Sequence, residues 1–422
     1  ALAGANIVCN LSASNELISK ADYREDLVRM TSAKSFCAYV YAGAGVMEST
    51  KDVVFGGHCL IAEAGQLLAQ SKRFELSPQA VIGDLDLQRL QHDRGQNTTF
   101  AQMPRPRAYR IVQADTALPA LSNLHRQYSN QPFVPEDENE FSARAQEILQ
   151  IQATGLARRM LAAKTERLVI GLSGGLDSTL AFLVAKDALG KLDLPAENLH
   201  ALTLPGPGTT SGTLTNAHRL AQTTGVSLQE ISIEAAVAQH LTDLSHAGEH
   251  DVVFENAQAR ERTQILFNHA NQVGGIVVGT GDLSELALGW ATFNADQMAN
   301  YNVNASVPKT LMAYLVRWYA QHRAQTDLAV VLQAVLDTPI SPELIPPKND
   351  EISQRTEDLV GPYELHDFFL YHWLRFGASP TKIFALACLS FQDQYAGEVI
   401  KHWLAQFFRR FMTQQFKRTT LP

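Results

Sequence analysis

A glycine-rich segment follows an apolar stretch near the middle of the chain. Residues 167–172 read as a strand, residues 173–178 are Ser-Gly-Gly-Leu-Asp-Ser, and a helical pattern follows directly. Glycines let a backbone approach an anion closely, and a helix N-terminus offers unpaired N–H groups. Because Ser173 and Ser178 add hydroxyl donors, the segment predicts a binding site for phosphate groups.

Asp177 is unexpected in such a segment, because a carboxylate repels phosphate oxygens. A Mg²⁺ ion bound by both groups would remove the conflict, so Asp177 predicts a metal ligand. The alternative is a glycine turn in which Asp177 only caps the helix. The Gly-Lys-Ser sequence of a Walker-type loop is absent from this segment.

Two later segments carry residues that suit the same chemistry. Thr280 follows the strand-like residues 275–279, and open α/β sheets bind ligands at the carboxyl ends of their strands. Glu285 follows Thr280 in the first turn of the next predicted helix and could be a second metal ligand, although the helix dipole alone also favours such a residue. Lys309 follows Pro308 at a predicted helix start, where its ammonium could neutralise phosphate charge.

Alternating strand and helix patterns surround these segments and must position them. They predict an α/β fold with a doubly wound parallel sheet. The predicted strands are residues 167–172, 199–204, 226–231 and 275–279, and the predicted helices are 139–163, 177–189, 214–224 and 256–273. The last third is mainly helical, with helices predicted at 311–321, 365–376 and 399–413.

A second domain is predicted in front of this one, since 422 residues exceed one ordinary core. It contains strand patterns at 7–11, 38–41, 53–55, 59–62 and 81–87, a helix at 22–33 and a hairpin turn at Ala64-Gly65. Residues 93–138 are rich in proline and poor in periodic apolar positions, which predicts a connector. The predicted domains are therefore 1–95 and 139–422, with 96–138 as the connector.

Composition limits the partners and the compartment. A net charge of −8 excludes a global basic field for nucleic acid, although Arg409, Arg410, Lys417 and Arg418 form a local cluster that could meet a phosphate or be solvated. The four cysteines show neither paired nor metal-ligand spacing. Without a secretory signal or a membrane-length apolar run, a cytoplasmic protein is expected, with no membrane and no nucleic acid among its partners.

The loop resembles the SGGxDS signature of the N-type ATP pyrophosphatases, which cleave ATP between its α- and β-phosphates. The resemblance implies an adenine nucleotide alpha-hydrolase-like fold. It also implies an ATP site that comprises Gly171, Leu172, Ser173, Gly174, Gly175, Leu176, Asp177, Ser178 and Thr280. The signature alone does not choose the substrate, because NAD⁺, GMP, asparagine and argininosuccinate synthetases and tRNA-modifying enzymes share it.

The substrate is indicated by residues 254–260, 279–290 and 301–310, which closely resemble the long, glutamine-dependent NAD⁺ synthetases. The resemblance implies a carbon–nitrogen ligase that adenylates deamido-NAD⁺ with ATP and amidates it with ammonia or glutamine nitrogen. It implies Asp177 and Glu285 as ligands of Mg²⁺, and Lys309 and Asp177 as catalytic residues. Contacts to deamido-NAD⁺ are expected from Asn256, Glu285, Trp290 and Lys417, and a homo-oligomer is expected.

Residues 1–95 resemble the C-terminal part of a carbon–nitrogen hydrolase, or nitrilase-like glutaminase, domain. The resemblance implies that Ser14 and Lys20 bind glutamine, although both could be surface turn residues. The family's catalytic Glu, Lys and Cys lie upstream of this stretch, so the chain is expected to be incomplete and to depend on free ammonia. Cys9 is then not the nucleophile and is expected to be buried.

Three alternatives remain at this stage. A GMP synthetase would accept xanthylate, and a non-catalytic scaffold would not release pyrophosphate. Sulfur transfer to tRNA would favour cysteine pairs and basic surface, which the sequence lacks. One departure from the resemblance is the segment after Trp290. Residues 292–296 look shorter and less flexible than the family's glycine-rich loop, so closure of this loop over the substrate is expected to differ.

Overall fold

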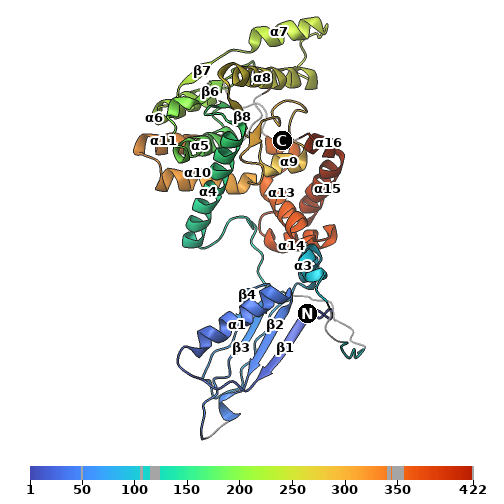
Figure 1. Ribbon diagram of the computed structural model, residues 1–422. Helices are drawn as coiled ribbons and strands as arrows, with labels where there is room; N and C mark the ends of the chain where they lie inside the picture. Colours follow the sequence, from blue (N-terminus) through green and yellow to red (C-terminus); the bar gives the residue numbers. More distant parts are fainter. Residues whose placement is uncertain (49–50, 105–107, 115–123, 340–343, 345–355, 421–422) are drawn as a thin grey trace. The chain divides into compact units, whose positions relative to one another are not determined.

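The computed structural model describes residues 1–48, 51–104, 108–114, 124–339, 344 and 356–420 (Figure 1). The chain forms two compact units. The first contains residues 1–129 and 372–390, and the second contains residues 130–371 and 391–422. None of the described helices is both long and apolar enough to cross a membrane.

The second unit is built on a parallel sheet with the strand order β7-β6-β5-β8-β9. Its central strands are short apolar runs that are buried on both faces, as expected where helices cover both faces. This confirms the predicted α/β class and parallel sheet. The strands are β5 (Leu168–Gly171), β6 (Leu199–Thr203), β7 (Leu228–Glu230), β8 (Ile276–Gly279) and β9 (Tyr301–Asn302).

Helices connect and cover these strands (Figure 1). Between residues 138 and 288 the helices are α4 (Glu138–Ala163), α5 (Leu176–Lys191), α6 (Ser211–Thr224), α7 (Glu234–Asp243), α8 (Val252–Val273) and α9 (Leu283–Leu288). The later ones are α10 (Lys309–His322), α11 (Thr326–Leu336), α12 (Thr356–Val360), α13 (Tyr363–Leu370), α15 (Gly397–Thr413) and α16 (Gln415–Arg418).

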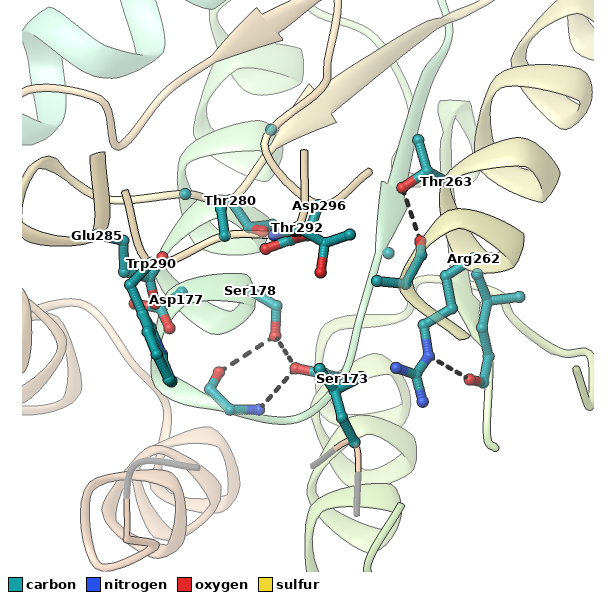
Figure 2. Close-up of a pocket in the computed structure, with 18 of the residues that line it drawn as sticks. Ser173, Asp177, Ser178, Arg262, Thr263, Thr280, Glu285, Trp290, Thr292 and Asp296 are labelled. Carbon is teal, nitrogen blue, oxygen red and sulfur yellow. Dashed lines mark hydrogen bonds between the residues drawn. The ribbon is translucent and has the colours of Figure 1, made fainter. Parts of the chain in front are cut away.

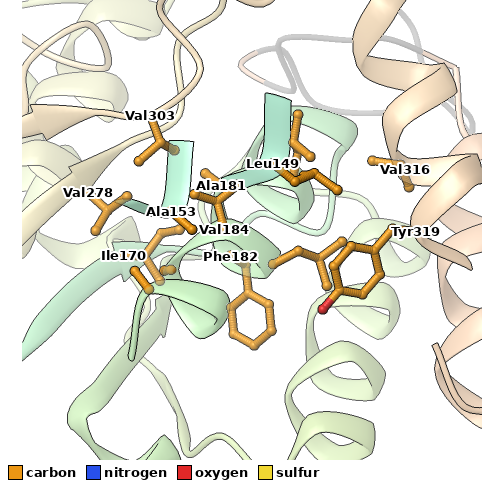
Figure 3. Packing of buried hydrophobic residues seen from close by; sticks show 14 of the residues in the cluster. Leu149, Ala153, Ile170, Ala181, Phe182, Val184, Val278, Val303, Val316 and Tyr319 are labelled. Atoms are coloured by element: carbon orange, nitrogen blue, oxygen red, sulfur yellow. The ribbon is translucent and has the colours of Figure 1, made fainter. Parts of the chain in front are cut away.

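Helix α5 lies in the middle of the second unit's main core (Figure 3). Ten of its sixteen residues are buried, so it is apolar nearly all round rather than along one stripe. Phe182 is fully buried and packs in the same cluster as Ile170 of β5 and Tyr319 of α10. The strand and helix on either side of the glycine-rich segment are therefore held rigidly by packing.

The first unit contains a four-stranded sheet in the order β1-β2-β3-β4. Strand β1 is parallel to β2, and the other pairs are antiparallel. Ala64 and Gly65 both have positive φ, which suits the two-residue hairpin turn that the sequence predicts. The elements are β1 (Ile7–Ser12), α1 (Lys20–Ser35), β2 (Ala38–Gly43), β3 (Cys59–Glu63), β4 (Gln66–Gln70), α2 (Leu87–Gln96), α3 (Thr98–Ala101) and α14 (Pro380–Ser390).

Helix α14 belongs to the first unit although it comes late in the sequence. Lys382 on α14 pairs with Asp86 at 2.5 Å, and the amide of Asp86 donates to the buried Glu63 at 2.5 Å. The predicted limits 1–95, 96–138 and 139–422 assumed continuous domains and remain a prediction. The compact units differ from them by grouping residues 372–390 with the first unit.

Several local predictions in the first unit are wrong. Residues 81–86 form no strand. Asp86 caps α2, and Asp84 accepts from the amides of residues 125 and 126, so the two alternating aspartates bind backbone amides at a helix start and in a loop. Residues 53–55 are not a strand either, and α2 and α3 occupy the start of the predicted connector. Parts of that connector, 105–107 and 115–123, lie outside the described residues. Cys9 is exposed rather than buried.

Replacement of Phe182 by alanine should destabilise the second unit. The ring is fully buried, so its removal leaves a cavity and is expected to cost about 3–5 kcal/mol. Urea unfolding followed by tryptophan fluorescence measures the loss. Leu161→Ala on α4 is the control, since that side chain is 59% exposed and its loss should change stability by less than about 0.5 kcal/mol.

Candidate functional site

A pocket of about 470 Å³ opens at the carboxyl ends of β5, β6 and β8. This is where ligands of open α/β sheets bind. The pocket brings together most of the sequence-predicted site residues from distant parts of the chain (Figure 2). Those that line it are Gly171, Leu172, Ser173, Gly175, Leu176, Asp177, Ser178, Asn256, Thr280, Glu285, Trp290 and Lys417.

The glycine-rich segment forms a turn that is held by its own serines (Figure 2). Ser173 Oγ accepts from the amide of Gly175 at 3.2 Å and lies 3.0 Å from Ser178 Oγ. Ser178 Oγ donates to the carbonyl of Gly175 at 3.2 Å. Gly174 has φ of +85°, and a Cβ there would lie 2.0 Å from the carbonyl oxygen of Thr213. Only glycine fits this position, and the two hydroxyls face the pocket.

Asp177 does not cap α5. The N-cap residue is Gly175, which has no side chain to occupy the helix N-terminus. The first-turn N–H groups of α5, which have no carbonyl partner within the helix, therefore point toward the pocket as anion donors. The buried Asn304 donates to the carbonyl of Asp177 at 3.0 Å and to that of Thr280 at 3.2 Å, and so fixes α5 against the end of β8.

Three carboxylates converge on the ammonium of Lys309. Its Nζ lies 2.7 Å from Asp177 Oδ1, 2.5 Å from Asp282 Oδ2 and 3.0 Å from Glu285 Oε1. Asp282 is completely buried, whereas 27% of the Asp177 side chain and 21% of the Glu285 side chain remain exposed toward the pocket. Glu285 is thus not the exposed first-turn residue of the alternative interpretation.

The electrostatics of this cluster favour another cation. Burial lowers the pKa of Lys309, but the three carboxylates outweigh it and hold that pKa well above its ordinary value. Burial raises the pKa of Asp282 to about 7, with Lys309 opposing the rise and Asp177 adding to it. Burial and Asp282 likewise raise the pKa of Glu285 well above its ordinary value. One ammonium therefore does not balance the three carboxyl groups.

The same carboxylates fit a divalent metal. One oxygen from each of Asp177, Asp282 and Glu285 lies within 4.8 Å of the others. Carboxylate oxygens are the ligands that Mg²⁺ prefers, and two of the three side chains are open to the pocket. Asp282 is the member that the sequence analysis missed. Its Oδ1 accepts from the amide of Glu285 at 2.9 Å, and an N-cap Asp three residues before Glu285 was the available signal.

Trp290 and the C-terminal helices form another wall of the pocket. The guanidinium of Arg410 lies 5.2 Å from the centre of the Trp290 ring, within cation–π range. Lys417 Nζ donates to the carbonyls of Gly289 at 2.8 Å and Ala291 at 2.6 Å. The residues before and after Trp290 are thereby tied to α16. Sequence reasoning found Lys417 but did not assign Arg410, which lines the pocket.

The segment after Trp290 is held at several points. Thr292 donates through Oγ1 to Asn256 Oδ1 at 2.8 Å, and its amide donates to Asp296 at 2.8 Å. The side-chain amide of Gln297 donates to the carbonyl of Lys417 at 3.1 Å. The segment is a cross-linked turn in the structure, and Asn256 is one of its anchors.

Two predicted residues belong to the other compact unit. Lys20 begins α1, and its Nζ donates to the carbonyl and the side-chain oxygen of Asn15 at 2.8 and 3.2 Å. Ser14 lies in the same loop and is partly buried. Nearby, Arg24 donates to Glu16 at 2.9 Å and contacts the buried His58 at 2.9 Å.

Comparisons with known proteins show which family the chain resembles. A family profile described as NAD synthase matches residues 148–410, more than half of the chain. Two curated relatives, both named glutamine-dependent NAD(+) synthetase, come from Mycobacterium leprae (strain TN) and Mycobacterium tuberculosis (strain ATCC 25618 / H37Rv). They are 41% and 42% identical over 100% of this chain. The chain spans 66% of the length of each relative.

A solved structure is also similar. It is a glutamine-dependent NAD(+) synthetase from Cytophaga hutchinsonii, with a TM-score of 0.54 and 19% identity. The match covers 99% of this chain and 65% of that one. At this identity the likeness shows a shared fold alone.

Replacement of Gly174 by alanine should weaken phosphate binding. The new Cβ would clash with the backbone of Thr213, and a positive φ disfavours alanine, so the turn must move. We expect ATP affinity, measured by isothermal titration calorimetry, to fall at least about tenfold, or about 1.4 kcal/mol.

Gly190→Ala is the matched control for this substitution. Gly190 lies in α5, where a Cβ meets nothing within 4 Å, so alanine should be tolerated or slightly stabilising. ATP binding by Gly174→Ala at wild-type affinity would contradict the assignment of this turn to phosphate.

Proposed function

Because the chain belongs to the NAD synthase family, we propose that it catalyses the ATP-dependent conversion of deamido-NAD⁺ to NAD⁺ with ammonia as the nitrogen source. The observation that carries the proposal is that Asp177 and Glu285, which pair with the buried Lys309, line the same pocket as the N-terminal turn of α5. A carboxylate substrate must be activated before ammonia can displace its oxygen. ATP cleaved between its α- and β-phosphates supplies that activation.

The reaction has two steps. In the first, the nicotinate carboxylate attacks the α-phosphorus of ATP, the α–β anhydride bond breaks, and pyrophosphate leaves. In the second, ammonia attacks the carbonyl carbon of the adenylate, the carbon–oxygen bond breaks, AMP leaves, and a proton passes from nitrogen to solvent. No residue forms a covalent bond with the substrate.

Positioning and charge account for the catalysis. The first-turn amides of α5 and the hydroxyls of Ser173 and Ser178 would bind the phosphates, together with backbone groups of residues 171–176 and Thr280. Lys309 would stabilise the departing pyrophosphate. Asp177 and Glu285, with Asp282 behind them, would hold Mg²⁺, which supplies charge neutralisation at the phosphate oxygens when bound.

The remainder of the pocket suits a dinucleotide. The indole of Trp290 offers an aromatic face for a nicotinate or adenine ring, and Asn256 offers an amide for a polar edge. Lys417 and Glu285, which line the same pocket as Trp290, would complete the deamido-NAD⁺ site. Arg262 and Arg410, which also line the pocket, add positive charge for phosphates.

For the first unit, we propose that residues 1–95 are part of a carbon–nitrogen hydrolase domain. Ser14 and Lys20 would hold the carboxylate of glutamine through a hydroxyl and an ammonium. The partners of the whole protein would be deamido-NAD⁺ and ammonia or glutamine, in a cytoplasmic homo-oligomer without nucleic acid or membrane. Analytical ultracentrifugation of the purified chain tests the oligomeric state.

The first test is product formation from deamido-NAD⁺, ATP, Mg²⁺ and ammonium. We expect NAD⁺, AMP and pyrophosphate in equal amounts, measured by chromatography, and loss of activity when Mg²⁺ is chelated. Glutamine is supplied in a parallel reaction as the nitrogen source, and xanthylate as an alternative acceptor. Formation of GMP from xanthylate, or of ADP and phosphate in place of AMP and pyrophosphate, would contradict the proposal.

The second test replaces Lys309 by methionine. Loss of the charge that meets pyrophosphate should lower kcat about 10²–10³-fold, comparable to the loss of one oxyanion donor, with a smaller change in KM for ATP. Circular dichroism melts in the presence of Mg²⁺ check that the variant is folded. A kcat within threefold of the wild type would remove Lys309 from the catalytic residues.

A further inference from the structure

A buried carboxylate outside the pocket joins two segments of the site. Asp367 lies on α13 and is 1% exposed. Its Oδ1 accepts from the hydroxyl of Ser284, and its Oδ2 accepts from the amide and the hydroxyl of Thr310 at 2.9 and 2.7 Å. Asp367 does not line the pocket, and the mechanism above does not use it.

Burial of a carboxylate is costly unless its oxygens are satisfied, so a buried Asp with three donors is a specific arrangement. One effect of these hydrogen bonds is found at the start of α10. The N-cap residue of α10 is Pro308, which has no side-chain acceptor for the first-turn amides. Asp367 accepts one of these amides, from Thr310, and Ser284 Oγ accepts the amide of Lys309 at 2.9 Å.

These hydrogen bonds form a closed ring that includes the backbone amide of Lys309. Asp367 binds Thr310, which follows Lys309, and Ser284, which precedes Glu285. Ser284 in turn binds the amide of Lys309. The backbones that carry the ammonium and its carboxylate partners are therefore held at a fixed separation, and α13 supplies the carboxylate that holds them.

We propose that Asp367 is a positioning residue for Lys309. It acts through Ser284 and Thr310, and it sets where the ammonium lies relative to Asp282 and Glu285. The expected effect on kcat rests on the proposed function, whereas the effect on the position of the Lys309 ammonium does not.

The kinetic test compares Asp367→Asn with Asp187→Asn. Asp187 is a matched control, because it also holds α10, by accepting from Tyr319 at 3.2 Å and pairing with Arg323 at 2.7 Å near the other end of that helix. We expect Asp367→Asn to lower kcat for NAD⁺ formation about 10–100-fold with KM for ATP within about threefold. Asp187→Asn should leave kcat unchanged even if it lowers the melting temperature.

The same substitution in a Lys309→Met background separates positioning from general destabilisation. If Asp367 acts through Lys309, Asp367→Asn should cause no further loss of kcat there. Equal losses in both backgrounds, or a kcat within twofold of the wild type, would overturn the proposal. If Asp367→Asn does not fold, Ser284→Ala and Thr310→Val each remove one donor and should each lower kcat several-fold.

A readout that needs no activity keeps the two proposals apart. Competitive acetylation with acetic anhydride, quantified at Lys309 by mass spectrometry, reports how firmly the carboxylates hold the ammonium. The labelling rate should rise several-fold in Asp367→Asn and stay unchanged in Asp187→Asn, and equal rates in both variants would overturn the positioning role. A wild-type protein that makes no NAD⁺ would refute the proposed function while this labelling still decides the role of Asp367.

Discussion

The ion cluster at Lys309 is the constraint on which the site depends. One ammonium, 2% exposed, holds three carboxylates from two other segments, the starts of α5 and α9, at distances of 2.5 to 3.0 Å. Removal of a partner from a buried ion pair leaves an uncompensated charge, which is strongly destabilising. The starts of α5, α9 and α10 are therefore interdependent, and none can move without disturbing the other two.

The fold supplies the rigid supports that this arrangement needs. Helix α5 is buried nearly all round from Ser178 to Leu189, so packing holds the body of the helix in place. Asn304 then joins α5 to the strand end through two carbonyls. Elsewhere in the pocket, Lys417 donates to the carbonyls on either side of Trp290, and Arg418 donates to carbonyls in α9. The pocket thus combines a rigid floor with a wall assembled from the end of the chain.

The sequence was sufficient to predict features that depend on local pattern or on a short motif. The parallel sheet, the glycine-rich turn, and the helix start at Lys309 were predicted because apolar periodicity and glycine or proline placement encode them locally. The pocket position of Asn256, Trp290 and Lys417 required the family resemblance, since no spacing connects them. Their individual roles remain predictions.

What sequence reasoning missed depends on three-dimensional proximity. Asp282 resembles any helix-capping residue until Lys309 is placed beside it, and Asp367 is one of the polar residues of a short helix that is buried at seven of its eight positions. The acidic alternation at Asp84 and Asp86 suggested a strand, because backbone capping and strand alternation produce the same short pattern. Cys9 was expected to be buried from its strand context, yet its side chain lies on an exposed face of β1.

The return of α14 to the first unit has a consequence for synthesis on the ribosome. About 240 residues of the second unit are made between the two segments of the first, which takes on the order of 10–50 s at ordinary elongation rates. During that interval Asp86, which caps α2, lacks its ion pair with Lys382. The nascent first unit therefore lacks this contact while the parallel sheet of the second unit is already available to fold.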